Sequence, residues 1–386
     1  MPVEEFNVYA WLSMYKYPWS KPDIKDIDSL AVSSAVASTW VSGGSEILKL
    51  TKNLCQFTGS QGAILVNNGT SALSATFLAL NLKPGDEVIV PAFGFMAAAN
   101  VLVQMHAVPI FADVNESSWC LDKINIEACI TKKTRAIVVT HTYGNSDDVE
   151  GIAKFAKEEL EIPLIEDAAE ALGSRSNGQA LGTFGDFGTF SFHATKLITT
   201  GEGGAIVFKN EEFAEKFKLL VSHGLDRKSH YLHLMPGTNF RMPNFCAALG
   251  NSQFSRIGSF IEARKAIDDL YRHNITSSSI GNFVNFQEHK NNEIVPWSFP
   301  IAFKKISPTR LSNIIRLLHE KGIETRPGFR TPNFLPYLKH MVDPRLFPIS
   351  QKLSTSIISL PAYPYLVEAD VELICNSLIE AFETES

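Results

Sequence analysis

The chain has 386 residues, of which 45% are hydrophobic and 20% are charged, and its net charge is −6. This composition is typical of a globular protein with sizeable apolar cores, and it excludes a disordered or fibrous chain. The slight acidic excess, with no basic block, argues against partners such as nucleic acid or an anionic membrane.

The five cysteines are scattered along the chain and include no CxxC pair. We therefore expect neither a metal site nor a disulfide framework, and the expected compartment is the reducing cytoplasm. The first twenty residues lack the layout of a signal peptide. The most apolar stretch, 92–112, contains polar residues and a proline, so we interpret it as a buried helix followed by a strand.

The first half of the chain alternates between helix and strand patterns. The expected elements are, in order, a helix at 46–57 with Ser45 as N-cap, a strand at 62–66, a turn at 67–70, a helix at 71–82, strands at 87–90 and 108–111 around a helix at 96–105, a strand at 136–140, a helix at 148–159 and a strand at 163–166. Near-continuous apolar strands that alternate with helices predict an α/β fold: a mixed, mostly parallel sheet with helices on both faces.

The second half begins with two more expected strands and then changes in texture near residue 250. The expected elements are strands at 189–193 and 204–208, a long helix at 254–271, a strand within 296–303, a helix at 309–321, a proline-rich irregular tract at 327–348 and a closing helix at 366–384. We predict three parts: an N-terminal extension (1–20), a large domain (21–250) and a smaller C-terminal α+β domain (251–386).

The first segment that could carry chemistry runs from Asn67 to Leu73, where a strand ends and a glycine precedes a helix. Backbone N–H groups and hydroxyls at the start of a helix form a site for an anion such as phosphate. The alternative is an ordinary N-cap, made by Thr70 or Ser71.

The second segment is 164–172, where Glu166 and Asp167 close an apolar strand. The carboxyl ends of strands in α/β sheets are where ligands bind, and an aspartate there can pair with a cationic ring nitrogen. Alternatively, Asp167 only caps the following helix.

The third segment is 190–204, in which Lys196 stands in a stretch without other charges before a Gly-Glu-Gly-Gly turn. A partly buried lysine has a lowered pKa and suits Schiff-base chemistry, although a lone lysine is more often a surface residue. Together, a phosphate cradle, a carboxylate for a pyridinium nitrogen and a lysine are what a pyridoxal phosphate enzyme requires.

With these motifs in order, the chain resembles the DegT/DnrJ/EryC1/StrS sugar aminotransferases, which are fold-type I pyridoxal phosphate enzymes. The resemblance covers 21 to the end. It rests on the segments 68–73, 84–91, 109–113, 141–144, 166–173, 182–186, 191–196, 201–204, 239–244, 322–327 and 360–361.

The resemblance implies a role for each matching residue. Lys196 matches the Schiff-base lysine, and Asp167 matches the carboxylate that binds the pyridine nitrogen. Phe95 matches the aromatic residue that stacks on the cofactor ring, and Glu170 matches a position near its phenolic oxygen. Gly69, Thr70 and Ser191 match ligands of the cofactor phosphate. Asn239 matches a further phosphate ligand, which the neighbouring subunit donates.

The Asn239 match implies a homodimer with shared active sites. The implied amino donor is L-glutamate, and the implied acceptor is a nucleotide-linked keto-sugar. Arg241 is a candidate ligand for the donor's carboxylate, or else a surface ion pair. Arg326, in the segment 324–327, is a candidate substrate residue. His141 and His193 are interpreted as packing or hydrogen-bonding residues, since Lys196 can itself transfer the proton.

Glu170 and the segment 324–327 look most like the GDP-perosamine synthase-like 4-aminotransferases, which aminate C4 of a 4-keto-6-deoxyhexose. The chain departs from that group at 331–333, where Thr-Pro-Asn replaces a segment with a histidine. Alternatives are a UDP- or dTDP-linked acceptor aminated at C3 or C4, a sugar dehydratase, a non-catalytic regulator that binds the cofactor, and a cysteine desulfurase. Lys196 argues against the dehydratases that carry histidine in its place, and no cysteine lies in a loop suited to a desulfurase.

Overall fold

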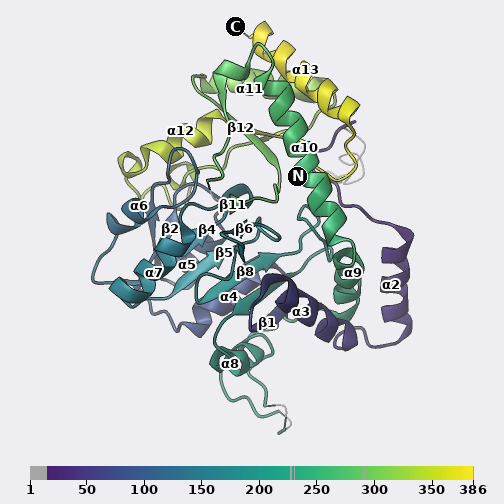
Figure 1. Cartoon of the computed structure of the whole chain (residues 1–386). Helices are drawn as coiled ribbons and strands as arrows, with labels where there is room; N and C mark the ends of the chain where they lie inside the picture. Colours follow the sequence, from purple (N-terminus) through teal and green to yellow (C-terminus); the bar gives the residue numbers. More distant parts are fainter. Residues whose placement is uncertain (1–14, 227, 230, 291, 386) are drawn as a thin grey trace, which may run out of the picture.

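The computed structural model describes residues 15–385, except for 227, 230 and 291. Its centre is a seven-stranded sheet (Figure 1). The strands, in spatial order, are β1 (Gly62–Val66), β9 (Gly204–Phe208), β8 (Phe187–Ser191), β5 (Leu164–Asp167), β4 (Thr134–Thr140), β2 (Glu87–Pro91) and β3 (Val108–Ala112). The strands from β8 to β3 are parallel, whereas β9 is antiparallel to both β1 and β8. The predicted mixed, mostly parallel sheet is therefore confirmed.

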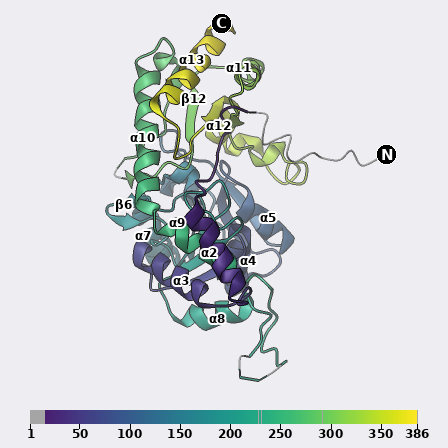
Figure 2. The same ribbon diagram turned by 90° about the vertical axis from the view of Figure 1, so that its right-hand side faces the viewer.

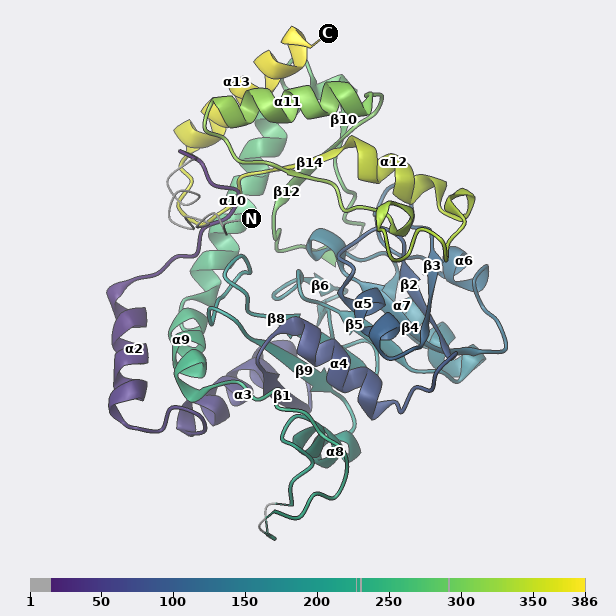
Figure 3. The same cartoon turned by 180° about the vertical axis from the view of Figure 1, so that it is seen from behind.

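Each central strand is apolar on both sides, because helices cover both faces of the sheet. In β2, Val88 and Val90 face one core while Ile89 faces the other, as the two-residue period of a strand requires. One face is covered by α4 (Gly69–Ala79), α5 (Ala97–Gln104) and α8 (Glu212–Leu220); the other by α3 (Ser45–Thr58), α7 (Val149–Phe155) and α9 (Asn244–Phe254). Figure 3 shows α4 in front of the sheet.

A second, four-stranded antiparallel sheet forms beside the first. Its order is β10 (Val284–Asn285), β12 (Phe299–Phe303), β14 (Ile357–Leu360) and β13 (Arg326–Pro327). Its core is shared with α10 (Ile257–Thr276), α11 (Pro308–Glu320) and α13 (Glu368–Thr384). Figure 2 shows α10 running from the large sheet to the small one. A three-stranded sheet consists of β11 (Asn292–Glu293), β6 (Arg175–Ser176) and β7 (Gln179–Ala180).

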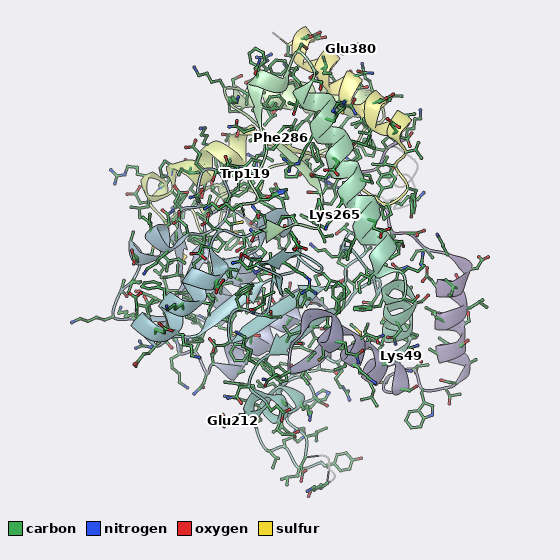
Figure 4. All side chains as sticks on the ribbon, viewed as in Figure 1. Lys49, Trp119, Glu212, Lys265, Phe286 and Glu380 are labelled. Carbon is green, nitrogen blue, oxygen red and sulfur yellow. The ribbon has the colours of Figure 1, made fainter. Side chains whose placement is uncertain are left out.

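A fourth apolar cluster joins the two larger sheets. Trp119, labelled in Figure 4 below α12 (Pro348–Ser356), is almost fully buried there. It packs with Phe93 and Tyr143 from the large-sheet side and with Leu353 and Ile357 from α12 and β14. The two sheets therefore share buried contacts. The predicted division of the chain at residue 250 stays a prediction.

The structure confirms the predicted strands of the first half and corrects several other details. Gly44, not Ser45, precedes the first residue of α3, and Asn244 Oδ1 accepts a hydrogen bond from Glu46 N there. The predicted helix at 254–271 is observed as α10, which begins at Ile257 and extends to Thr276, and Ser255 and Arg256 separate it from α9. The prediction missed α2 (Asp26–Ala37), α6 (Lys123–Glu127), α8, α9 and α12.

Part of the predicted N-terminal extension, 1–14, lies outside the described residues. From Tyr15 on, the chain runs along the small sheet. Tyr17 N donates to Gly322 O at 2.9 Å, and the Tyr17 ring is part of the small-sheet core. Trp19 N donates to Glu324 Oε2 at 2.8 Å. Among the described residues, no helix combines the length and apolarity needed to span a membrane.

Asp113, which follows β3, holds the start of α12 from a distant part of the chain. Its buried carboxylate accepts hydrogen bonds from Val114 N (2.9 Å), Ile349 N (2.9 Å), Ser350 N (2.8 Å) and Ser350 Oγ (2.6 Å). This one side chain connects the edge of the large sheet to the helix that leads into β14.

We predict that Asp113→Ala lowers the free energy of unfolding by about 2–4 kcal/mol, because it leaves several buried donors without an acceptor. Urea denaturation followed by circular dichroism measures the change. Glu116→Ala, at an exposed ion pair with Lys352 nearby, is the control and should change stability by less than about 1 kcal/mol. Equal effects of the two substitutions would contradict the capping role of Asp113.

Candidate active site

A cavity of about 610 Å³ lies at the carboxyl ends of β5 and β8, where the two larger sheets meet. This is the edge at which α/β sheets bind ligands. Most of the sequence-predicted site residues line it. They are Gly69, Thr70, Phe95, Asp167, Glu170, Ser191, Lys196 and Arg326.

The start of α4 forms one end of the cavity. Asn68, not Thr70 or Ser71, is the N-cap, and its Oδ1 accepts from Ser71 N at 2.7 Å. A Cβ on Gly69 would lie 3.1 Å from Ser191 Cβ, so glycine allows the helix to begin close against β8. The free N–H groups of the first turn and the Ser191 hydroxyl thus face the same space, as an anion site requires.

Asp167 ends β5 at the floor of the cavity. Its carboxyl is almost fully buried, and Ala169 N donates to Oδ1 at 3.2 Å. Burial raises the pKa of Asp167, while the Ala169 N–H, Lys196 and His141 act in the opposite direction. A cationic group bound beside it would stabilise the ionised form further.

Lys196 and Glu170 face each other across the cavity. The Lys196 side chain is only 14% exposed, so it is not a surface lysine, and its Nζ lies 3.9 Å from Glu170 Oε1. Burial lowers the pKa of Lys196 and raises that of Glu170 to about 7. Tyr143 N donates to Glu170 Oε2 at 2.8 Å and fixes the carboxyl in place. Glu170 can therefore hold a proton near neutral pH beside the Lys196 amine.

The two histidines behave as hydrogen-bonding residues. His141 is fully buried, and its Nε2 lies 2.8 Å from Glu166 Oε2. Glu166 also accepts from the backbone N–H groups of Gly182, Phe184 and Gly185. His193 Nδ1 lies 3.0 Å from Thr195 Oγ1 at the rim of the cavity.

The walls of the cavity are formed by aromatic side chains that the sequence analysis did not assign to the site. The Tyr143 ring stacks on Trp297 and Phe329, and Trp19 meets Trp297 edge-on at 5.1 Å. Lys196 Nζ lies 3.9 Å from the centre of the Trp297 ring. The sequence before residue 20 is rich in aromatic residues, which could have indicated that this segment packs against another part of the protein. Where Trp19 packs depends on the small sheet, which the local sequence does not reveal.

Tyr143 has φ 59° and ψ 20°, which is unusual for a bulky residue and costs backbone strain. Its neighbour Gly144 has φ 89°, and a Cβ there would lie 2.8 Å from Val295 O. This tight turn brings the Tyr143 ring against the loop that carries Trp297.

Phe95 is 63% exposed and lies at the cavity, so it is not an ordinary core residue. Arg326 also lines the cavity and pairs with Glu324 at 2.5 Å. Asn239 and Arg241 do not line it. They are exposed, and Arg241 Nε donates to Asn239 Oδ1 at 3.1 Å.

These residues fit pyridoxal phosphate. The N-terminus of α4 with Ser191 suits the phosphate, buried Asp167 suits the ring nitrogen, and the uncharged form of Lys196 suits the aldehyde. Within the described part of the chain, no three His, Cys, Asp or Glu side chains gather as ligands for a metal ion.

Comparison with known proteins gives the same chemistry. A model of the DegT/DnrJ/EryC1/StrS aminotransferase family matches residues 22–379. GDP-perosamine synthase of Escherichia coli O157:H7 is 35% identical over 372 residues, covering 95% of this chain and 98% of the relative. GDP-perosamine synthase of Vibrio cholerae is 32% identical over 369 residues, covering 95% and 99%.

A solved structure shows the same fold with the cofactor. The putative sugar aminotransferase Spr1654 from Streptococcus pneumoniae in its PMP form superposes with a TM-score of 0.91 at 27% identity, covering 96% of this chain and 98% of that one. The same protein has been solved in a PLP form.

The proton on Glu170 predicts a pH effect on the stability of the cofactor-free protein. Its pKa of about 7 when folded lies above its unfolded value of 4.5, so the folded chain binds more protons between these values. This group therefore contributes stability at low pH that is lost as the pH rises to about 7, on the order of 3 kcal/mol in all.

Glu170→Gln should remove this dependence, so the variant gains stability relative to the unmodified protein between about pH 5 and 8. Urea denaturation across that range measures the difference. Glu202→Gln, an exposed position at the rim of the same cavity, should leave the pH profile unchanged. If the free energy of unfolding changed with pH in the same way in Glu170→Gln and in the unmodified protein, the Glu170 carboxyl would not be protonated in the folded state.

Proposed function

The chain belongs to the DegT/DnrJ/EryC1/StrS aminotransferase family, and we propose that it moves the amino group of L-glutamate to C4 of a nucleotide-linked 4-keto-6-deoxyhexose. It is a pyridoxal phosphate-dependent sugar aminotransferase. Two observations support the finer proposal. Lys196 and Glu170 meet in one cavity, and relatives named GDP-perosamine synthase match nearly the whole chain at 32–35% identity.

Pyridoxal phosphate, when bound, supplies an electron sink beside the carbon that loses or gains the amino group. In our proposal, Asp167 binds the ring nitrogen and keeps it protonated, which favours that electron flow. Gly69, Thr70 and Ser191 hold the phosphate, and Phe95 covers the ring.

Lys196 performs the proton transfers. Its Nζ would hold the cofactor covalently, and its amine, when free, would accept and return the proton of the donor's α-carbon. Burial favours the uncharged amine, which can accept that proton. Glu170, 3.9 Å away, holds a proton close to Lys196 through both half-reactions.

The walls of the cavity exclude water from this chemistry. Trp297 covers Lys196, while Trp19, Tyr143 and Phe329 make the rest of an apolar enclosure. Arg330 and Arg326, the latter paired with Glu324, also line the cavity and are candidate ligands for the diphosphate of a sugar nucleotide.

We predict that the purified protein loaded with pyridoxal phosphate shows an absorbance band of the lysine-bound cofactor that bleaches when L-glutamate is added. Of the GDP-, UDP- and dTDP-linked 4-keto-6-deoxyhexoses, the GDP-linked sugar should restore the band most efficiently. Lys196→Ala should still hold the cofactor without a covalent bond, and its turnover should fall by roughly 10³-fold or more. Bleaching by L-glutamate with recovery only by a 3-keto-sugar would contradict the choice of carbon.

We also propose a homodimer in which Asn239 of one subunit reaches the cofactor phosphate of the other. Asn239 is exposed, and it forms an antiparallel bridge with Ser222, which lies shortly after α8. Apolar side chains on α2 and the turn after it are also exposed, as an interface between copies requires: Ile27, Leu30, Val36 and Trp40. An amide lent in this way would complete the phosphate site at α4.

Asn239→Ala should weaken cofactor binding roughly tenfold or more, the effect of losing one hydrogen bond to a charged group. Mixed with Lys196→Ala chains, it should regain activity up to about a quarter of that of the unmodified dimer, because half the dimers are mixed and each holds one intact site. Activity after subunit exchange measures this. The absence of any recovery in verified mixed dimers would exclude shared sites.

A further inference from the structure

Arg264 is a buried cation that the proposed chemistry does not use. It lies in α10 and is 3% exposed. Among the described residues, no carboxylate forms an ion pair with it, and its Nε has no hydrogen-bond partner. A buried arginine without an acid is costly and rare, so its position calls for a specific role.

The guanidinium contacts the backbone behind the aromatic walls of the cavity. Arg264 Nη1 donates to Trp297 O and to Ala362 O, each at 2.6 Å. Ala362 N in turn donates to Trp19 O at 3.1 Å. One side chain on α10 thus binds the loop that carries Trp297 and the loop of Ala362, and the latter loop in turn holds the segment of Trp19.

The Trp297 side chain contacts the Lys196 amine directly. Its ring lies 3.9 Å from Lys196 Nζ, and its Nε1 donates to Thr195 O at 3.1 Å. Trp19 packs edge-on against the same ring. A shift of the Trp297 backbone would therefore move the ring that covers Lys196.

The charge of Arg264 is not neutralised nearby. Burial lowers the pKa of Arg264 only to about 10, so it stays positive at neutral pH. Tyr365 is the ionisable group that acts on it, and Asp268, one turn along α10, pairs with Arg272. Lys196 faces the acids Glu170 and Asp167, and the positive charge of Arg264 opposes their effect on its pKa.

We propose that Arg264 is a positioning residue that holds the Trp297 and Trp19 walls from behind and places an unneutralised positive charge on the side of the cavity where Lys196 lies. The inference rests on the proposed function of Lys196. The helix α10 does not line the cavity. Through Arg264 it would nevertheless affect both the shape of the site and the charge state of the Lys196 amine.

Three variants separate these effects. Arg264→Gln removes the charge, and Arg264→Lys keeps it but has a shorter side chain that does not place a donor where Nη1 reaches both carbonyls. Lys265→Gln removes a charge from the exposed side of the same helix, where Figure 4 labels Lys265, and is the matched control. Each variant is loaded with pyridoxal phosphate, and the absorbance band of the lysine-bound cofactor is titrated with pH.

We expect the titration midpoint to rise by roughly half a unit or more in Arg264→Gln, because removing a nearby positive charge favours the protonated form of the lysine nitrogen. Arg264→Lys and Lys265→Gln should keep the midpoint of the unmodified protein. Both Arg264 variants should raise KM for the sugar acceptor roughly fivefold, as expected for the loss of about one hydrogen bond, with a smaller change in kcat.

An unchanged midpoint in folded Arg264→Gln would overturn the role of the charge, and an unchanged KM in both variants would overturn the role in holding the walls. If Arg264→Gln does not fold, Arg264→Lys still decides: an unchanged KM, or a midpoint that moves although the charge is kept, overturns the proposal. Failure of the proposed function is distinct, because the unmodified protein would then show no band.

Discussion

The site depends on one physical constraint: an amine and two carboxyl groups are taken out of water into the same cavity. Lys196, Glu170 and Asp167 all have pKa values shifted toward the uncharged form, and burial is the largest cause for each. Water in the cavity would relax those shifts, so the enclosure is part of the chemistry. The aromatic walls are the parts that maintain it.

The enclosure needs both larger sheets. The large sheet supplies the groups proposed to bind the cofactor at the ends of adjacent strands, since Asp167 ends β5 and Ser191 ends β8. The small sheet and the loops around it supply Trp297, Phe329 and, through the N-terminal segment that runs along it, Trp19. The strained turn at Tyr143 fits between these parts and fixes Glu170 through its backbone N–H.

This arrangement separates the residues that react from those that support them. The reactive groups stand on strand ends and on a short loop, where the register of the parallel sheet holds them. Asp113 and Arg264 act from outside the cavity by binding backbone groups of segments far away in sequence. Buried polar side chains of this kind fix how loops dock, because an unpaired donor or acceptor in the core is costly.

The sequence alone determined the mixed, mostly parallel sheet and the choice of residues that we propose for the site. Apolar strands of regular spacing predict the sheet, and the motifs around Gly69, Asp167 and Lys196 predict what its edge carries, because both signals are local. The N-cap Asn68, the break before α10 and the walls Trp19 and Trp297 were decided by tertiary structure. They depend on contacts between segments up to about 300 residues apart, such as Trp19 N with Glu324, and no local pattern encodes which distant backbone group such a side chain or loop will meet.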